Sequence, residues 1–181
     1  MSKPQAWCSR IAAWTALASL ALVPAAGRAA PAAPCSAPEC RQFDFWIGDW
    51  DVQKADGTPA GTNRIEKILG GCALEENWKG ARGSAGRSLN LWDATDGRWH
   101  QTWVDDQGTR LVLEGGLEGA RMVMTGESPT SNGGRALNRI TWTPVDRDRI
   151  EQRWEVSADG GRTWNDAFYG LYVRRKSGAG K

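Results

Sequence analysis

The sequence has few of the residues on which most metal and catalytic sites depend. It contains one histidine, His100, and its four cysteines include no Cys-x-x-Cys pair, so a structural zinc site is not expected. Any Ser/His/Asp triad would have to use the same histidine, and the segment RGSAG lacks the spacing of a nucleophile elbow. Glu75 and Glu76 are adjacent, so on a strand they point to opposite faces and form no carboxylate pair. We therefore predict no metal, no cofactor and no catalytic residue, which disfavours an enzyme.

Long hydrophobic runs are absent except near the N-terminus. After a basic start, residues 11–26 carry no charge and lead into small residues and prolines. This layout predicts that residues 1–30 are a cleaved secretory signal peptide, with a periplasmic or secreted product and no membrane span after cleavage. Val23-Pro24-Ala25 and Ala30-Pro31-Ala32 both satisfy the small-residue rule for cleavage, so the cut site stays open.

Clusters of basic residues are also missing. The chain has 23 basic and 21 acidic residues, but three of the basic ones lie in the leader, which leaves 20 against 21. No Lys/Arg cluster suited to phosphates remains, so a nucleic-acid partner is not expected. The remaining chain of about 150 residues suits one domain. We expect an N-terminal tail over 31–42, a barrel domain over 43–176 and a disordered C-terminus over 177–181.

Cysteine usage allows one disulfide in the exported chain. Cys8 leaves with the leader, so Cys35, Cys40 and Cys72 remain. In an oxidising compartment an odd number permits one pair and one spare thiol. Pairing either Cys35 or Cys40 with Cys72 would tie the tail to the barrel wall. We favour that arrangement over Cys35–Cys40, whose small loop would constrain little.

No segment after the leader keeps a helical apolar period for ten residues. Instead, turn pairs such as Asp56-Gly57, Gly70-Gly71 and Asp96-Gly97 recur at a spacing of about ten to fifteen residues, as between antiparallel strands. The pattern predicts an all-β fold of about eight to ten strands. Because nearly every link reads as a hairpin, we expect an up-and-down barrel similar to lipocalins and fatty-acid-binding proteins, with a sandwich as the alternative.

One turn has a more specific pattern. Ser157 to Trp164, SADGGRTW, matches the Asp box, in which the Asp159 carboxylate caps backbone amides and Trp164 packs beneath the turn. Sialidase-type propellers repeat this box once per blade, whereas here it occurs once in a short chain. We therefore interpret it as a structural hairpin and not as a glycosidase signature.

Strand alternation places most of the tryptophans on one face, which must be the inner face because the other positions are charged. The positions assigned to it are Trp46, Gly48, Trp50, Val52, Leu74, Glu76, Trp78, Ser88, Asn90, Trp92, Trp99, Gln101, Trp103, Ile140, Trp142, Ile150, Gln152, Trp154, Phe168, Gly170 and Tyr172.

Four polar side chains share that inner face with the indoles, namely Glu76, Asn90, Gln101 and Gln152. A core built for stability alone would avoid them, because an unpartnered buried polar group costs about 1–3 kcal/mol. An apolar wall with a few polar groups is typical of small-molecule sites. The predicted ligand-binding set is Glu76, Trp78, Asn90, Trp92, Gln101, Trp103, Gln152, Trp154 and Tyr172.

The expected ligand is a small apolar or amphipathic molecule. In the alternative, these polar groups bond to indole N–H groups or trapped water inside a filled barrel, and the protein is a structural or protein-interaction module. A third hypothesis is an enzyme that uses the polar residues of the interior, with Glu76 at its centre. The sequence carries no signal of oligomeric state.

Several segments together resemble an exported bacterial family of unknown function with a lipocalin-like barrel. The resemblance runs from about Cys35 to Arg175 and rests on FDFWIGDWDV, GTNRIEKILGGCALEENWKG, GRSLNLWDATDGRWHQTWVDDQG and RITWTPVDRDRIEQRWEVSADGGRTW followed by GLYVRR. It implies the barrel fold and names no activity.

The first strand also resembles the lipocalin Gly-x-Trp signature, at Gly48 and Trp50. That resemblance implies that Trp50 closes one end of the barrel, with Arg174 or Arg175 from the last strand stacked over it. Phe43 and Phe45 are expected to plug the same end. Haem-binding barrels of related architecture need an inward histidine, and alternation places His100 outside.

Overall fold

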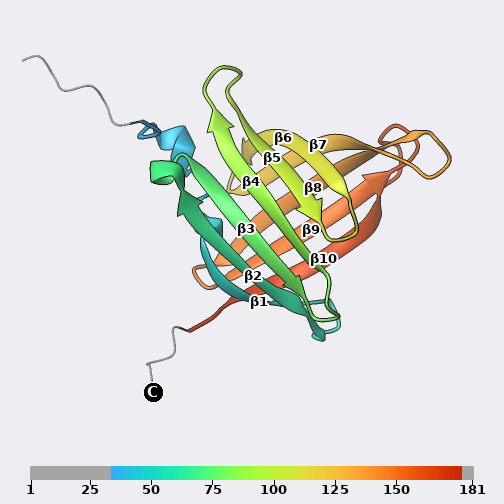
Figure 1. Cartoon of the computed structure of the whole chain (residues 1–181), viewed down its shortest axis with the longest axis horizontal. Helices are drawn as coiled ribbons and strands as arrows, with labels where there is room; N and C mark the ends of the chain where they lie inside the picture. The colour runs from blue at the N-terminus through green and yellow to red at the C-terminus, as the bar shows by residue number, and fades with distance from the viewer. Residues whose placement is uncertain (1–33, 177–181) are drawn as a thin grey trace, which may run out of the picture. The chain divides into compact units, whose positions relative to one another are not determined.

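The computed structural model describes residues 34–176, which form one closed antiparallel barrel (Figure 1). The predicted signal peptide, 1–30, and the predicted disordered C-terminus, 177–181, lie outside the described residues. The barrel follows chain order, which confirms the up-and-down prediction over the sandwich. Its ten strands are β1 Gly48–Gln53, β2 Pro59–Ile68, β3 Ala73–Gly80, β4 Ala85–Asp93, β5 Arg98–Asp105, β6 Arg110–Glu118, β7 Arg121–Pro129, β8 Arg135–Asp146, β9 Arg149–Ser157 and β10 Asn165–Arg174.

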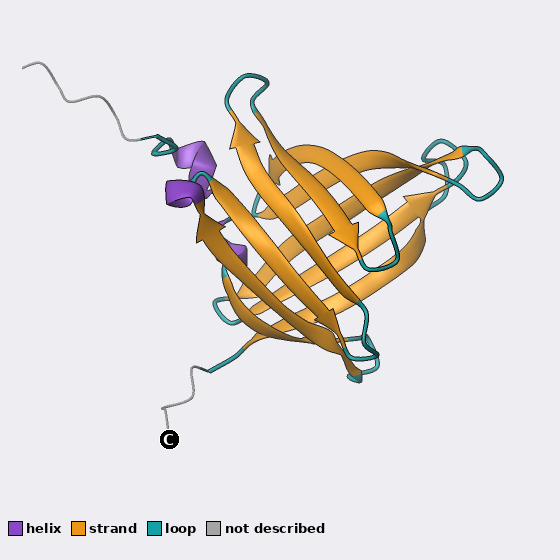
Figure 2. Cartoon of the chain, viewed as in Figure 1, coloured by secondary structure: helices purple, strands orange, loops and turns teal. Residues whose placement is uncertain are grey.

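The first and last strands close the barrel. β1 pairs with β10 in the register Trp50 to Arg174 and Val52 to Tyr172, and every other neighbour is joined by a short connection. Closure leaves no sheet edge with unpaired backbone groups. In Figure 2 the strands surround the interior, while the short helices lie together at one end.

The tail before the first strand closes that end, here called the plugged end. It contains the 3-10 helices η1 Pro38–Arg41 and η2 Asp44–Trp46, and a third, η3 Leu69–Gly71, joins β2 to β3. Phe43 stacks on Trp46 with ring centroids 4.8 Å apart and meets the ring edges of Trp99 and Trp142. All four rings are buried, which confirms Phe43 as a plug, and Phe45 packs half-buried against it.

Gly48 and Trp50 make the contact expected of the Gly-x-Trp signature. The Arg174 guanidinium lies 4.1 Å above the Trp50 ring, and its Nη1 donates to the Ile47 carbonyl at 2.9 Å. Gly48 has a φ of 142°, a conformation that side chains rarely adopt, and a Cβ there would clash with that guanidinium. Arg174, and not Arg175, therefore fills the stacking role.

A disulfide fastens the tail to the barrel. Cys35 bonds to Cys72, across a sequence separation of 37 residues, and Cys40 makes no disulfide in the described part of the chain. Cys72 lies between η3 and β3 at the plugged end. The prediction that Cys72 joins the tail to the wall is confirmed, with Cys35 as the partner.

The inner face agrees with the predicted alternation. Glu76, Asn90, Gln101 and Gln152 are all buried beside the aromatic core. Alternation assigned no inner positions to β2, β6 or β7. Of these, β6 and β7 contribute the buried apolar side chains Leu111, Leu113, Met122 and Met124. Within residues 34–176, none of the helices has the length and apolar character that crossing a bilayer requires.

Candidate functional site

Glu76 is the centre of a polar network inside the barrel. Its register on β3 places it beside Ser88 of β4, whose Oγ donates to Glu76 Oε2 at 2.6 Å. On the other side, Asn63 Nδ2 of β2 donates to Glu76 Oε1 at 2.7 Å. All three side chains are at most 5% exposed. The buried carboxyl group is thus hydrogen-bonded to side chains of both flanking strands.

The network continues in both directions around the wall. Toward β5, Asn90 Nδ2 donates to Ser88 Oγ at 2.9 Å, and Gln101 Nε2 donates to Asn90 Oδ1 at 2.7 Å. Toward β9, Asn63 Nδ2 also donates to the Tyr172 hydroxyl at 3.2 Å, and that hydroxyl donates to Gln152 Oε1. The resulting series, here called the polar belt, is Gln152, Tyr172, Asn63, Glu76, Ser88, Asn90 and Gln101.

Burial changes the acid–base properties of the belt. It raises the pKa of Glu76 above its ordinary value, because the charged form loses its hydration, while the hydrogen bonds from Ser88 and Asn63 act in the opposite direction. Burial also raises the pKa of Tyr172 well above its usual range, and the nearby Glu76 adds to that effect. The Tyr172 hydroxyl therefore stays protonated at neutral pH.

The raised pKa of Glu76 predicts a specific pH dependence of stability. The folded chain holds this proton more tightly than the unfolded chain. The stabilisation of the folded state by protonated Glu76 is therefore complete below a pH near 4.5 and is lost as pH rises through the folded-state pKa. The free energy of unfolding of Glu76→Gln, relative to that of wild type, should therefore rise with pH between about 4.5 and the folded-state pKa of Glu76. The rise is at most about 1.4 kcal/mol per pH unit.

Urea unfolding at pH 5 and pH 8 measures this difference. The matched control is Glu75→Gln, because Glu75 lies on the outer face and pairs with Arg87 at 3.2 Å. A difference between Glu76→Gln and wild type that stays constant from pH 5 to pH 8 would contradict the assignment.

A group of half-buried aromatic side chains lies at the end opposite the plug, here called the far end. The group, called the far-end aromatics, is Trp78, Trp103, Trp154 and Phe168. Trp78 and Phe168 meet edge to face with centroids 5.9 Å apart, and Trp154 Nε1 donates to Asn138 Oδ1 at 2.9 Å. A hollow of about 310 Å³ on the outer surface of β3, β4 and β5, lined mostly by exposed residues such as Lys79 and Arg87, also touches Trp78.

Two glycines make room for these indoles. The Trp78 ring lies against Gly61 of β2, and the Trp103 ring lies against Gly86 of β4, so that a Cβ at either position would overlap the ring. Glycine in a strand interior weakens the strand unless close packing requires it. Glycine at these two positions therefore allows each indole to pack closely against the neighbouring strand.

The residues predicted to bind a ligand lie in three parts of the barrel. Glu76, Asn90, Gln101, Gln152 and Tyr172 all belong to the polar belt, and Trp78, Trp103 and Trp154 belong to the far-end aromatics. Trp92 lies instead toward the plugged end, opposite Trp99, whose Nε1 donates to Gln42 Oε1 at 3.1 Å.

Sequence reasoning missed Asn63, which links the two halves of the belt. The signal was present in the strand alternation, because Asn63 lies two residues before the buried Ile65. It also missed Asn138, which precedes Ile140 by the same interval and accepts the Trp154 indole hydrogen bond.

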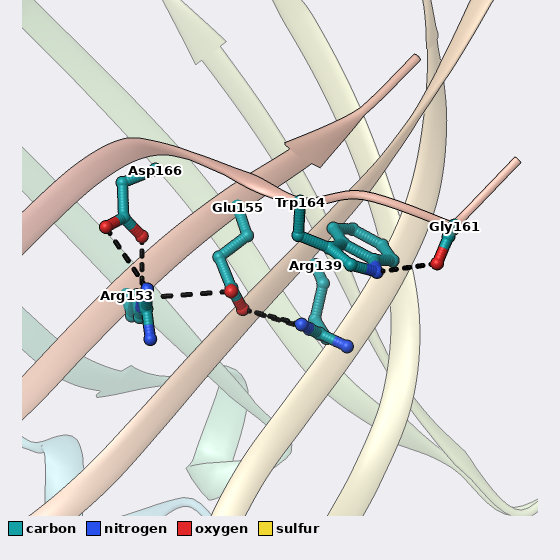
Figure 3. Close-up of polar contacts among 6 residues, drawn as sticks. All are labelled: Arg139, Arg153, Glu155, Gly161, Trp164 and Asp166. Atoms are coloured by element: carbon teal, nitrogen blue, oxygen red, sulfur yellow. Dashed lines mark hydrogen bonds and ion pairs between the residues drawn. The ribbon is translucent and has the colours of Figure 1, made fainter. Parts of the chain in front are cut away.

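The Asp box forms a capped hairpin, as the sequence predicts. Asp159 Oδ1 accepts hydrogen bonds from the backbone amides of Arg162 and Thr163 at 3.0 and 2.9 Å. The hydrogen bond from the Thr163 hydroxyl has the largest effect, followed by those from the Thr163 amide, the Ser157 hydroxyl and the Arg162 amide, and together they lower the pKa of Asp159 to about 2. Trp164 Nε1 donates to the Gly161 carbonyl at 3.1 Å (Figure 3).

Beside this hairpin, charged side chains line a hollow of about 620 Å³ on the outer wall of β7 to β10. Figure 3 shows that they pair among themselves: Arg139 with Glu155 at 2.9 Å, and Arg153 with Asp166 at 2.6 Å. Arg139 also lies 4.1 Å above the Trp164 ring. Because these acids and bases pair with one another, the cluster binds β8, β9 and β10 together.

His100 lies on the outer wall, as alternation predicts. Its Nε2 is 2.8 Å from Asp96 Oδ2, and ligand atoms of Asp93, Asp96 and His100 lie within 4.8 Å of one another. Both carboxylates also accept hydrogen bonds from backbone amides of the same turn, Asp93 from Thr95 N–H and Asp96 from Arg98 N–H. A capped turn with a histidine–aspartate contact accounts for this arrangement.

Neither a scan against protein-family models nor a search of curated proteins finds a match to this chain.

Proposed function

We propose that the barrel binds a small, partly apolar molecule in its interior, between the far-end aromatics and the polar belt. The observation that carries this proposal is the combination of half-buried rings at one end with a buried carboxyl–amide network beneath them. Ligand sites in proteins combine an apolar lining with a small number of polar groups in this way. A barrel of ten strands is also wider than the eight-stranded barrels that side chains can fill.

The two ends differ in a way that supports entry at the far end. At the plugged end Trp50, Trp99 and Trp142 are at most 2% exposed, and Trp92 alone of the tryptophans there is half-buried. At the far end Trp78 and Trp103 remain partly exposed. Large aromatic surfaces left partly open to solvent are a common mark of binding sites.

Titrations that follow tryptophan fluorescence and thermal shift, over lipids, aromatic metabolites and tetrapyrroles, test this proposal. Trp78→Leu should weaken the best ligand about five- to thirtyfold, because an aromatic contact in a ligand site is worth on the order of 1–2 kcal/mol. Trp92→Leu is the matched control, since it removes a half-buried indole near the other end and should change affinity less than about twofold.

A filled barrel is the second candidate, and a specific observation favours it: most polar groups of the belt already bond to one another. In that case the protein is a structural or interaction module. No quenching and no thermal shift across the whole set of ligands would support it and would overturn the binding proposal. Equal loss of affinity in Trp78→Leu and Trp92→Leu would place the ligand elsewhere.

We also infer that the protein works in the periplasm or outside the cell, as a member of the exported family that its motifs resemble. The Cys35–Cys72 disulfide supports an oxidising compartment. Fractionation should find the chain there in a form shortened by the leader. Full-length chain confined to the cytosol would contradict the inference.

A further inference from the structure

Glu76 is a buried acid without a basic partner. It is 5% exposed, and no lysine, arginine or histidine of residues 34–176 forms an ion pair with it. Arg174 lies over Trp50 and pairs with Asp148 at 3.3 Å. The charged form of Glu76 would thus gain much from a cation brought into the interior.

A second acceptor next to Glu76 also needs a donor. Asn63 Nδ2 donates to Glu76 and Tyr172, whereas Asn63 Oδ1 is buried with no donor among the described residues. A buried carbonyl oxygen left without a hydrogen bond costs about 1–3 kcal/mol. Water can fill this need in the empty barrel, and the N–H group of a ligand can replace the water.

The other residues of the site also suit a ligand that carries a cationic N–H group. Trp78 and Trp103 offer indole faces at the far end, and an indole face attracts a cation more strongly than other aromatic rings do. Leu113, opposite Gln101 in the register of β5 and β6, is a buried apolar side chain next to the polar belt. Acid, unpartnered acceptor, indole faces and apolar wall all favour an ammonium group on an apolar frame.

We propose that the interior site, on the premise that it binds a ligand at all, takes small organic ammonium cations. The ammonium group donates to the Glu76 carboxylate and to Asn63 Oδ1, and the apolar body lies toward the far-end aromatics. Binding leaves Glu76 ionised, so any proton that Glu76 carries in the empty barrel passes to solvent. The belt residues Ser88 and Tyr172 hold the carboxylate and the amide in position.

Three probes with similar bodies test the charge preference by calorimetry at pH 7: 2-phenylethylamine, 2-phenylethanol and 3-phenylpropionate. The amine should bind at least about tenfold more tightly than the alcohol, as expected for a charge-assisted hydrogen bond, and the carboxylate should bind least. Glu76→Gln should reduce the amine's preference over the alcohol to less than about threefold. Glu75→Gln, on the outer face, should leave all three unchanged.

A second measurement needs no variant. The ammonium group keeps its proton up to a pH of about 10, as a lysine side chain does, and Tyr172, the titratable side chain bonded to Asn63, stays neutral. The affinity of wild type for the amine should therefore rise with pH until it passes the raised pKa of Glu76, while the affinity for the alcohol should not rise.

The possible failures separate the two proposals. Equal affinity for amine and alcohol in wild type, or an amine affinity independent of pH, overturns the cation preference and leaves interior binding in place. Binding of an uncharged lipid or a tetrapyrrole at Trp78 with no binding of the amine does the same. Absence of binding by all three probes and by the wider set of ligands overturns both.

Discussion

Phe43→Ala is expected to lower the free energy of unfolding by about 3–5 kcal/mol, the range for a large buried aromatic residue replaced by alanine. Phe43 is fully buried and contacts Phe45, Trp46, Trp99 and Trp142. Its loss leaves a cavity where the tail meets the barrel wall. Urea unfolding at neutral pH, followed by tryptophan fluorescence, measures the change.

Leu69→Ala is a suitable control, because Leu69 is 76% exposed in η3 at the same end. Its substitution should change the unfolding free energy by less than about 0.5 kcal/mol. If Phe43→Ala were as mild as Leu69→Ala, the tail would not be part of the folded core, and the plugged end would have to be described as open.

Loss of the disulfide is expected to have an effect of similar size. Cys35→Ser removes a link across 37 residues, which corresponds to about 4 kcal/mol by the chain-entropy relation and to 2–5 kcal/mol in small secreted domains. The same link holds the segment that carries Phe43 against β3. Guanidinium unfolding of wild type and variant, with and without a reducing agent, gives the measurement.

Cys40→Ser is the matched control, since Cys40 makes no disulfide in the described residues and is only half-buried. It should cost less than about 1 kcal/mol. Reduction should destabilise wild type and Cys40→Ser equally and leave Cys35→Ser unchanged. A reducing agent without effect on wild type would show that the Cys35–Cys72 bond does not restrain the unfolded chain.

Strand alternation predicts much of this barrel because most strands have one polar, often charged, face and one apolar face that is rich in tryptophan. The positions of Glu76, Gln101 and Gln152 follow from their spacing to neighbouring tryptophans, and the plug follows from the aromatic run before Gly48. These features depend on local periodicity, which a single sequence displays directly.

The features that escaped prediction depend on contacts between distant strands. The height of each residue along the barrel is set by register, so Trp92 and Trp78 look alike in sequence yet lie toward opposite ends. The link from Asn63 to Tyr172 joins residues 109 positions apart, and no local pattern reports it. For the same reason, the choice between Cys35 and Cys40 needed the path of the tail.

The most direct test of interior binding is to locate the tryptophan side chains whose surroundings change when a ligand binds. Two-dimensional NMR of the tryptophan indole N–H groups, titrated with 2-phenylethylamine or the best ligand found, locates it residue by residue. Interior binding predicts shifts at Trp78, Trp103 and Trp154, with Trp50 and the outer-wall Trp164 unchanged. Shifts confined to Trp164, or no shifts at saturating ligand, would contradict a ligand site inside the barrel.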